Sequence, residues 1–340
     1  EEVFSELFHQ LSKADRVSFD FAYDQVVSMG EVLSTIIINE FLVKSGMESR
    51  WADSRQLINT DSNYRHETVK MDITIQAIQD LVKDAPKITV IQGFIAHDEK
   101  GNTTTLGREG SDYTAALLAY ALDVKEVTIW KDVDGVYNAD PKLFENTVLI
   151  PKLSYREAVE LAFYGASIIH PKTIQPLQKK KINLRVRSFY HQRNAGSVVG
   201  SSKHHEVQPP SYIIKKQQVL ISLVPRDFSF MDASNMALAF QILGNHQHQV
   251  NLIQNSAISF SICLDDNPNH FEAMVEELSK HFELRYNLNQ VLVTIRHYQT
   301  ELIDQIDALL SFKMEQRNRS TYQILLSEEE FENKLLPILN

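Results

Sequence analysis

Apolar residues recur every three or four positions in several stretches of the first two hundred residues, and this spacing predicts amphipathic helices. The clearest stretches are residues 2–13, 69–82 and 154–164. Gly165 is predicted to end the last of them, and Pro171 suits the first turn of the next helix. A further helix is predicted to follow a turn at residues 28–30 and to end at Gly46, because glycine readily adopts the left-handed backbone of a helix end.

Short continuous apolar runs lie between the predicted helices. Residues 88–91 have the composition of a strand buried on both faces of a parallel sheet, residues 127–130 are predicted to form another short buried strand, and residues 183–188 are predicted to form the strand that closes the domain. Strands that alternate with helices predict an α/β fold with a mostly parallel sheet sandwiched by helices. Residues 98–102 are predicted to form a hairpin turn. Ligands of such sheets bind beyond the carboxyl ends of strands, where Gly93 and residues 105–112 would lie.

The pattern changes after a polar stretch that ends in Pro209 and Pro210. The following residues read strand, helix, strand, strand, helix, strand, the order of a ferredoxin-like unit. A second round begins at residue 291 but lacks a final strand, which the extended residues 212–215 can supply. We therefore expect two interleaved ferredoxin-like α+β units in residues 208–340, after a first domain in residues 1–207.

Composition narrows the class of protein. The 340 residues are 43% hydrophobic, as in a globular chain, and the formal net charge of −10 disfavours a nucleic-acid surface. The single cysteine, Cys263, excludes an internal disulfide and fits a reducing compartment, so we expect a cytoplasmic protein. We recognise no apolar run near the length of about 20 residues that crosses a bilayer, and no signal peptide. Because the chain begins at Glu1 instead of methionine, we expect its natural beginning to lie upstream.

The stretch TTTLGREGSDYTAA, which begins at Thr103, combines hydroxyls, glycines and charges at the start of a predicted helix. Gly107 and Gly110 permit left-handed backbone and close approach to a ligand. Ser111 or Asp112 is predicted to cap the helix. Free N–H groups and the positive end of the helix dipole then favour a phosphate or a carboxylate at this point.

The charged residues of the predicted sheet edge suit a small zwitterion. Arg108 offers a planar fork for a carboxylate, and Glu31 a counter-charge for an ammonium group. The sequence contains no GxxxxGK[ST], GxGxxG, HExxH or CxxC motif. Phosphoryl transfer needs mainly positioning and charge neutralisation, which these groups supply in part. A well-capped helix after a flexible loop is the structural alternative, but capping does not explain the crowding of threonines, glycines and arginine.

Seven ordered motifs between residues 26 and 200 carry a family resemblance. They are SMGEVLS from Ser28, WADSR from Trp51, QGFI from Gln92, TTTLGREGSDYTAA from Thr103, WKDVDGVYNADP from Trp130, PKLSYREAVEL from Pro151 and GASIIHPKT from Gly165. Together they resemble the aspartate kinases of the amino-acid kinase family. The two units after the linker resemble the paired ACT domains through which that family responds to end-product amino acids.

The resemblance implies ATP-dependent phosphorylation of the β-carboxylate of L-aspartate to 4-phospho-L-aspartate, the first step of lysine, threonine and methionine biosynthesis, with Mg²⁺ shielding the phosphates. It implies that Glu31 binds the α-ammonium and Arg108 the α-carboxylate. It assigns catalytic roles to Asp112 and Ser111. The remaining implied residues are Phe94, Thr105 and Ser111 around the substrate, and Lys131, Asp132, Tyr137 and Lys142 around ATP.

The chain departs from the family pattern at three places. The opening glycine-rich KFGGTS-like strand with its lysine is absent, and Ser167 stands where many relatives carry a lysine or an amide. Asn251 and Ala257 replace acidic residues of lysine-sensitive relatives. The effector therefore stays open between lysine and threonine. Its expected contacts are Asp232, Ser234, Asn235, Asn251 and Gln254, in a homodimer joined through the ACT-like units.

Two rival functions and three structural interpretations remain beside the family resemblance. A sibling kinase that acts on glutamate, acetylglutamate or a nucleotide is the enzymatic rival. A non-catalytic, amino-acid-binding regulatory subunit is the rival from another class. Asp53 and Arg55 are interpreted as a supporting ion pair, and His170 as a structural residue at a helix start. Tyr137 is as consistent with core packing as with a nucleotide contact.

Overall fold

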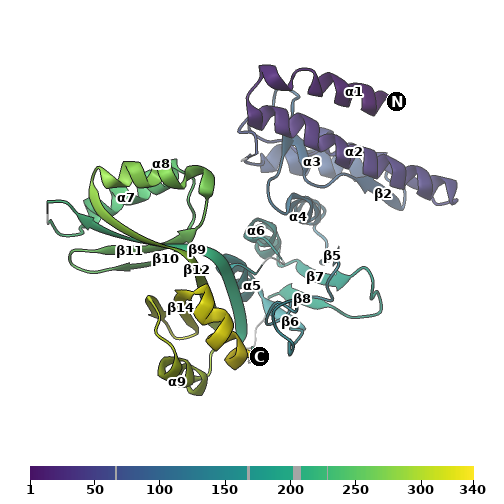
Figure 1. Cartoon of the computed structure of the whole chain (residues 1–340). Coiled ribbons are helices and arrows are strands. Elements are labelled where there is room, and N and C mark those ends of the chain that lie inside the picture. The colour runs from purple at the N-terminus through teal and green to yellow at the C-terminus, as the bar shows by residue number, and fades with distance from the viewer. Residues whose placement is uncertain (66, 167–168, 202–207, 228) are drawn as a thin grey trace. The chain divides into compact units, whose positions relative to one another are not determined.

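The computed structural model describes residues 1–65, 67–166, 169–201, 208–227 and 229–340. The chain forms two compact units (Figure 1). The first comprises Glu1–Val136 and Pro151–His205, and the second comprises Tyr137–Ile150 and Glu206–Asn340. The segment Tyr137–Ile150 thus groups with the C-terminal part of the chain. The domain division expected from the sequence had placed this segment in the first domain, residues 1–207.

The helices of the first unit follow the predicted pattern closely. They are α1 (Glu2–Leu11), α2 (Phe19–Lys44), α3 (Met71–Val82), α4 (Gly110–Leu122), α5 (Tyr155–Tyr164) and α6 (Pro171–Lys180), with short 3-10 turns at Ala14–Arg16 and Ser54–Gln56. Gly165 ends α5 with φ +117°, and Gly46 follows α2 with φ +80°, so both predicted helix ends are confirmed.

Helix α2 corrects one prediction, because no turn interrupts it at residues 28–30. Ser18 caps the helix by accepting a hydrogen bond from the Phe21 N–H at 3.4 Å, so the helix begins well before the predicted turn. Gly30 stays inside the helix at a cost of about 1 kcal/mol relative to alanine. Burial of Met29 and Val32 offsets that cost.

Helix α2 also corrects the expectation that no apolar run approaches membrane-spanning length. By length and composition alone its 26 residues can cross a membrane, and 22% of the most apolar window is buried. Length and composition are weak evidence, since core helices of soluble proteins have the same properties. Asp24 and Gln25 are buried on this helix and make hydrogen bonds to Thr105 and Thr103.

The strands of the first unit form small sheets. In the first sheet, β1 (Ser49–Ala52) lies parallel to β2 (Ile88–Ile91), and in the second, β3 (Ile95–His97) forms a hairpin with β4 (Thr103–Thr105). The third sheet has four strands in the order β5 (Glu126–Lys131), β7 (Asn183–Ser188), β8 (Ser197–Gly200) and β6 (Lys152–Ser154). The predicted turn at residues 98–102 is confirmed by this hairpin. The residues of β2 are half-buried, in contrast to the expected burial on both faces. The fold is α/β, and β7 and β8 pair antiparallel.

The second unit contains one six-stranded antiparallel sheet. Its order is β10 (Val250–Asn255), β11 (Phe260–Asp265), β9 (Ser211–Pro225), β12 (Phe282–Arg296), β14 (Thr321–Ser327) and β13 (Met314–Arg317). Two long strands form its centre, because β9 and β12 pair along most of their lengths (Figure 1). The first residues of β9, 211–215, lie opposite residues 292–296 of β12.

Alternating side chains of the central strands divide this sheet into two faces. Val219, Ile221 and Leu223 pack with α7 (Ala233–Asn245) and α8 (Pro268–Ser279). In the other half, the corresponding apolar residues of β12 pack with α9 (Thr300–Leu309) and the C-terminal helical segments Glu328–Glu330, Phe331–Leu335 and Leu336–Leu339. Leu220, Leu292 and Leu325 belong to a separate buried cluster, and residues 290–296 of β12 are all buried, so the middle of the sheet is covered on both faces.

Candidate functional site

Two glycines let the loop after β2 pack directly on the start of α4. A Cβ atom on Gly93 would lie 2.7 Å from the Cβ of Ser111. A Cβ atom on Gly110 would lie 2.7 Å from Cδ2 of Phe94. Real Cβ atoms do not approach other atoms so closely, so both positions require glycine unless the backbone moves. The motifs QGFI and TTTLGREGSDYTAA, separate in the sequence, thus form one surface.

Phe94 is held between this loop and the helix in a left-handed backbone conformation, with φ +70°. Its N–H donates to Oγ1 of Thr114 at 3.1 Å, and its carbonyl accepts from the Leu106 N–H at 2.7 Å. Left-handed backbone is costly for a residue with a side chain and persists where its surroundings fix it. Phe94 is therefore rigidly placed at the start of α4.

The start of α4 corrects the predicted cap. The helix begins at Gly110, so Ser111 and Asp112 lie inside its first turn instead of capping it. The cap position belongs to Glu109, which has left-handed backbone (φ 54°, ψ 33°), and no side-chain cap is found there in the described part of the chain. Gly107 has left-handed backbone (φ +72°), and its carbonyl accepts a hydrogen bond from the Gly110 N–H at 3.0 Å. This tight turn lets α4 begin at Gly110, earlier than predicted. Without a side-chain cap, the first N–H groups can bind an anion.

Asp112 forms an ion pair with Lys131, the last residue of β5. Oδ2 of Asp112 lies 2.9 Å from Nζ of Lys131, with side chains 14% and 20% exposed. Glu109 lies close to this pair, and burial raises the pKa of its carboxyl group while the charge of Lys131 opposes that shift. A cation is therefore fixed beside the uncapped helix start, close to two carboxyl groups.

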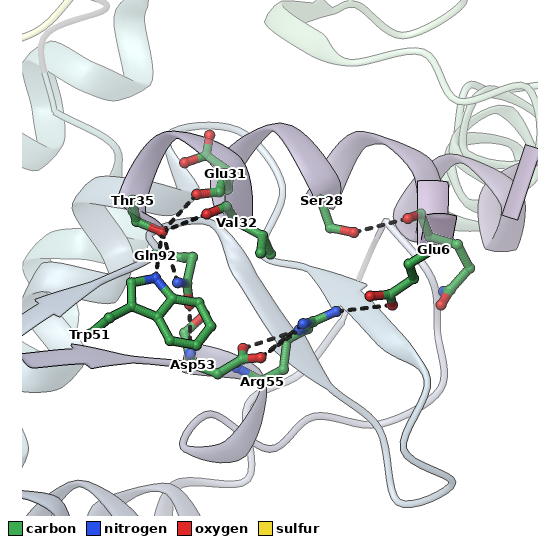
Figure 2. A network of polar contacts seen from close by, with 11 residues as sticks. Glu6, Ser28, Glu31, Val32, Thr35, Trp51, Asp53, Arg55 and Gln92 are labelled. Carbon is green, nitrogen blue, oxygen red and sulfur yellow. Dashed lines mark hydrogen bonds and ion pairs between the residues drawn. The ribbon is translucent and has the colours of Figure 1, made fainter. Parts of the chain in front are cut away.

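Glu31 lies one turn before Thr35 on α2, at the edge of a polar network (Figure 2). Oγ1 of Thr35 accepts hydrogen bonds from Nε1 of Trp51 at 3.0 Å and from Nε2 of Gln92 at 2.8 Å. Oε1 of Gln92 accepts from the Ser54 N–H at 2.8 Å. These bonds join α2 to both parallel strands and fix the residue that precedes Gly93.

The two charges expected to hold a zwitterion are available. Figure 2 shows the Glu31 carboxylate pointing away from the network, and burial raises its pKa. Among the described residues, neither the Glu31 carboxylate nor the guanidinium of Arg108 has an ion-pair partner. Arg108 is exposed on the loop before α4. Groups of opposite charge without internal partners are what an amino-acid ligand would require.

Asp53 and Arg55 form the supporting pair predicted from WADSR. The guanidinium donates from Nε and Nη2 to the Asp53 carboxylate at 2.8–3.1 Å, and Nη1 donates to Glu6 at 3.4 Å (Figure 2). His170 likewise has the predicted structural role, since its Nδ1 accepts from the Lys172 N–H at 3.1 Å at the start of α6.

Thr105 is fully buried, and its hydroxyl donates to Oδ1 of Asp24 at 2.8 Å. Its side chain therefore faces α2. Sequence reasoning missed Asp24 and its neighbour Glu67. An acidic residue in the largely apolar stretch FDFAYDQVV was the available sign, because buried carboxyl groups need partners.

The four residues expected around ATP are divided between the units. Lys131 and Asp132 belong to the first unit, Tyr137 and Lys142 to the second. Ser167 lies outside the described residues. The ATP contacts of Asp132, Tyr137 and Lys142 stay predictions. The part of the chain with described coordinates contains no group of three His, Cys, Asp or Glu side chains arranged around a metal position.

Three of the expected effector contacts lie at the start of α7. Asp232 caps this helix by accepting from the N–H groups of Ser234 at 3.0 Å and Asn235 at 2.9 Å. The side-chain amide of Asn235 donates to the carbonyl of Phe230 at 2.9 Å. The Asp232 carboxylate therefore accepts hydrogen bonds from two N–H groups that were expected to bind an effector carboxylate.

The other two expected effector contacts lie on β10, at an edge of the six-stranded sheet. The Asn251 side chain accepts from Nζ of Lys215 and donates to Gln218 and Asp265, each at 2.7 Å. Gln254 is exposed on the same strand. Asn251 thus takes part in an internal network, whereas Gln254 faces solvent.

The first unit thus presents a glycine-lined helix start without a side-chain cap, the fixed Lys131, and the charges of Arg108 and Glu31, which have no ion-pair partner among the described residues. The profile of the amino acid kinase family matches residues 4–188. The chain belongs to the amino acid kinase family.

Two relatives that match most of this chain are aspartokinases. The lysine-sensitive aspartokinase 3 of Escherichia coli is 34% identical over 247 residues, which are 71% of this chain and 54% of that protein. Chloroplastic aspartokinase 1 of Arabidopsis thaliana is 30% identical over 272 residues, 76% of this chain and 48% of that protein. The chain thus spans about half the length of these relatives.

Solved structures agree with this grouping. The crystal structure of E. coli aspartokinase III in complex with aspartate and ADP is 25% identical, with a TM-score of 0.83, covering 100% of this chain and 79% of that chain. The complex of the same enzyme with lysine and aspartate has a TM-score of 0.81 at 25% identity, covering 99% of this chain and 79% of that chain.

Proposed function

We propose that the full-length protein is an aspartate kinase that transfers the γ-phosphoryl group of ATP to the β-carboxylate of L-aspartate. The observation that carries this proposal is the set of charges in the first unit: Arg108 before α4 and Glu31 on α2, which have no ion-pair partner among the described residues, and Lys131, which is paired with Asp112. The names of the relatives, and the aspartate and ADP in the E. coli structure, support the choice of substrates.

Arg108 would bind the α-carboxylate of L-aspartate through its planar fork, and Glu31 the α-ammonium. The β-carboxylate, the one carboxyl group left over, would then face the helix start. Its oxygen attacks the γ-phosphorus while the bond to the leaving oxygen of ADP breaks, so the products are 4-phospho-L-aspartate and ADP. Because little covalent chemistry is needed from the protein, fixed charges supply most of the catalysis.

Lys131 would neutralise charge on the transferring phosphoryl group, and Asp112 would hold the side-chain ammonium group of Lys131 in place. The uncapped N–H groups of α4 and the left-handed Gly107 leave backbone donors open to phosphate oxygens, so these residues fit a nucleotide. Glu109 and Asp112 present carboxylate oxygens next to Lys131, and Mg²⁺ commonly takes one or two carboxylates together with phosphates. Bound Mg²⁺ would shield the phosphate charges.

The free carboxylate of Glu31 distinguishes the substrates. An acetylated nitrogen carries no charge, so acetylglutamate would leave Glu31 buried against a neutral group. Glutamate keeps the ammonium, but its side chain is one methylene longer and its carboxylate would reach beyond the position set for aspartate. Michaelis constants for aspartate, glutamate and acetylglutamate test the proposal directly, with aspartate expected to have the lowest value.

We infer that the second unit consists of two interleaved ferredoxin-like ACT units that regulate the kinase. The pairing of residues 211–215 with residues 292–296 supports the interleaving. Edge strands β10 and β13 leave backbone groups for pairing with a second copy, so a homodimer through this unit is proposed.

The effector is proposed to be lysine or threonine, because the two expected contacts on β10, Asn251 and Gln254, have neutral amides that favour neither a charged nor a neutral effector side chain. Titration calorimetry of the full-length protein with lysine, threonine and methionine tests this, and heat from none of them would remove the regulatory role. A cytoplasmic location is proposed because the one cysteine is buried and unpaired.

A further inference from the structure

Two carboxyl groups lie buried together behind Thr105. Asp24, on α2, is 0% exposed, and Glu67, in the segment before α3, is 7% exposed. The Thr105 N–H lies 3.2 Å from Oδ2 of Asp24 and 3.0 Å from Oε1 of Glu67. The Arg65 N–H lies 3.1 Å and 2.7 Å from the same two oxygens. The two carboxyl groups therefore share two backbone donors and lie against each other.

Two negative charges in this position would repel each other with little solvent to separate them. Burial raises the pKa of Glu67 to about 8, and its hydrogen bond with Asp24 adds to the shift. Oε2 of Glu67 is also buried without a hydrogen-bond partner among the described residues, which is costly for an ionised carboxylate. Burial and the neighbouring Asp24 therefore favour the protonated form of Glu67 at neutral pH.

The pair joins three segments at the base of the glycine loop. Asp24 belongs to α2, and Thr105 ends β4 two residues before Gly107. Arg65 has left-handed backbone (φ +66°), and its carbonyl oxygen is 3.6 Å from the position of a Cβ atom on Gly107. Through Thr105 and Arg65, the two carboxyl groups fix the backbone that leads into Arg108.

Among the described residues, the other charged groups near the pair have partners of their own. The Arg65 guanidinium contacts Asp20 at 2.9 Å and lies over the rings of Phe19 and Tyr23. On the hairpin side, the hydroxyl of Tyr64 donates to Asp98 at 2.9 Å, and His97 contacts the amide of Asn59 at 3.0 Å. On the loop side, Asp61 accepts from the N–H groups of Asn63 and Thr68. Glu67 therefore titrates mainly against Asp24.

We propose that Asp24 and Glu67 form a proton-sharing positioning pair that sets Thr105 and the Gly107 loop for binding of the amino-acid substrate. The inference rests on the proposed function for the identity of that substrate. Neither residue is assigned contact with substrate; both act through the backbone and hydroxyl of Thr105 and the backbone of Arg65. Ionisation of Glu67 would separate the two carboxyl groups and displace the loop.

The test uses the full-length protein and the variants Asp24→Asn and Glu67→Gln. Asp24→Asn is expected to raise the KM for aspartate about tenfold or more, because charge-assisted hydrogen bonds from Thr105 are lost. The KM for ATP should change much less. In the parent protein the KM for aspartate should rise as the pH passes about 8. Glu67→Gln, whose side chain cannot ionise, should remove that rise.

Asp98→Asn is the matched control, since Asp98 is another fully buried carboxylate, at the opposite end of the same hairpin. It should lower Tm without changing the KM for aspartate. If Asp24→Asn behaves like Asp98→Asn, or if Glu67→Gln keeps the alkaline rise, the positioning role is wrong. Glu67→Gln has nearly the shape of the parent side chain and keeps the test available if Asp24→Asn does not fold.

Infrared spectroscopy separates this inference from the proposed function. The parent protein at pH 7 should show the carbonyl stretch of a neutral buried carboxylic acid, and Glu67→Gln should lack it. Absence of that band from the parent overturns the shared proton, even if the protein is an aspartate kinase. Its presence in a protein without kinase activity would uphold the pair and reject the proposed substrate.

Discussion

Nζ of Lys131 lies 2.9 Å from Oδ2 of Asp112, which joins the end of β5 to the first turn of α4. The pair places a cation beside a helix start whose N–H groups lack a side-chain cap in the described structure. An anion at this point would meet the helix dipole and the lysine together. This arrangement is the physical basis of the phosphoryl transfer that we propose for the site.

Replacement of Asp112 tests the role of this pair. Asp112→Asn should keep the fold but lower turnover of the full-length enzyme by about 10²- to 10³-fold, because a preorganised charge at the reacting centre is lost. Steady-state kinetics with saturating aspartate and ATP measure the effect, with circular dichroism as the check on folding. Equal turnover in variant and parent would remove Asp112 from the mechanism.

Arg108→Lys should weaken binding of L-aspartate by about 1.5 to 3 kcal/mol, since a point ammonium cannot replace a bidentate, charge-assisted pair. The KM for ATP should stay close to that of the parent. Arg193→Lys, at another exposed arginine, is the control for general effects of the exchange. A rise in the KM for ATP alone would assign Arg108 to the nucleotide.

Two glycine-to-alanine variants test the packing at the start of α4. Gly110→Ala should destabilise the protein by about 1–3 kcal/mol, because the new Cβ would overlap the ring of Phe94. Gly30→Ala adds the same group inside α2, where no atom lies within 4 Å of it apart from the adjacent residues and the helix backbone, and should stabilise by about 0.5–1 kcal/mol. Denaturant unfolding measures both. The same sign for both variants would contradict the proposed close packing of Gly110.

The stability of the protein should depend on pH through Glu67. Its pKa is raised from 4.5 to about 8 by burial, so the folded protein binds this proton more tightly than the unfolded chain. The resulting stabilisation is fully present below about pH 4.5 and is lost as the pH rises through about 8. Glu67→Gln should have a flatter dependence of Tm on pH between these values. Parallel curves for variant and parent would show that Glu67 does not titrate as described.

Local sequence chemistry predicted most elements of the first unit. Helix ends at Gly46 and Gly165 and the hairpin at residues 98–102 follow from backbone preferences that act within a few residues. The continuous α2 could not be predicted in this way. Gly30 and Ser28 indicate a turn locally, but contacts with β4, far away in the sequence, stabilise the helix.

The residues of the candidate site likewise differ in whether short motifs or long-range contacts reveal them. Arg108, Asp112 and Glu31 were predicted because their residue types stand out within short motifs. Glu67 and Asp24 were missed because their importance depends on shared contacts with Thr105, 38 and 81 residues away. A pattern along the chain does not reveal which buried carboxyl groups meet.

The central claim is tested most directly by trapping the product. The full-length protein, incubated with ATP, Mg²⁺ and hydroxylamine, should form a hydroxamate with L-aspartate, because an acyl phosphate reacts with hydroxylamine. Glutamate and acetylglutamate should give far less under the same conditions. Equal or greater hydroxamate from either of them, or none from L-aspartate in a folded protein, would contradict assignment as an aspartate kinase.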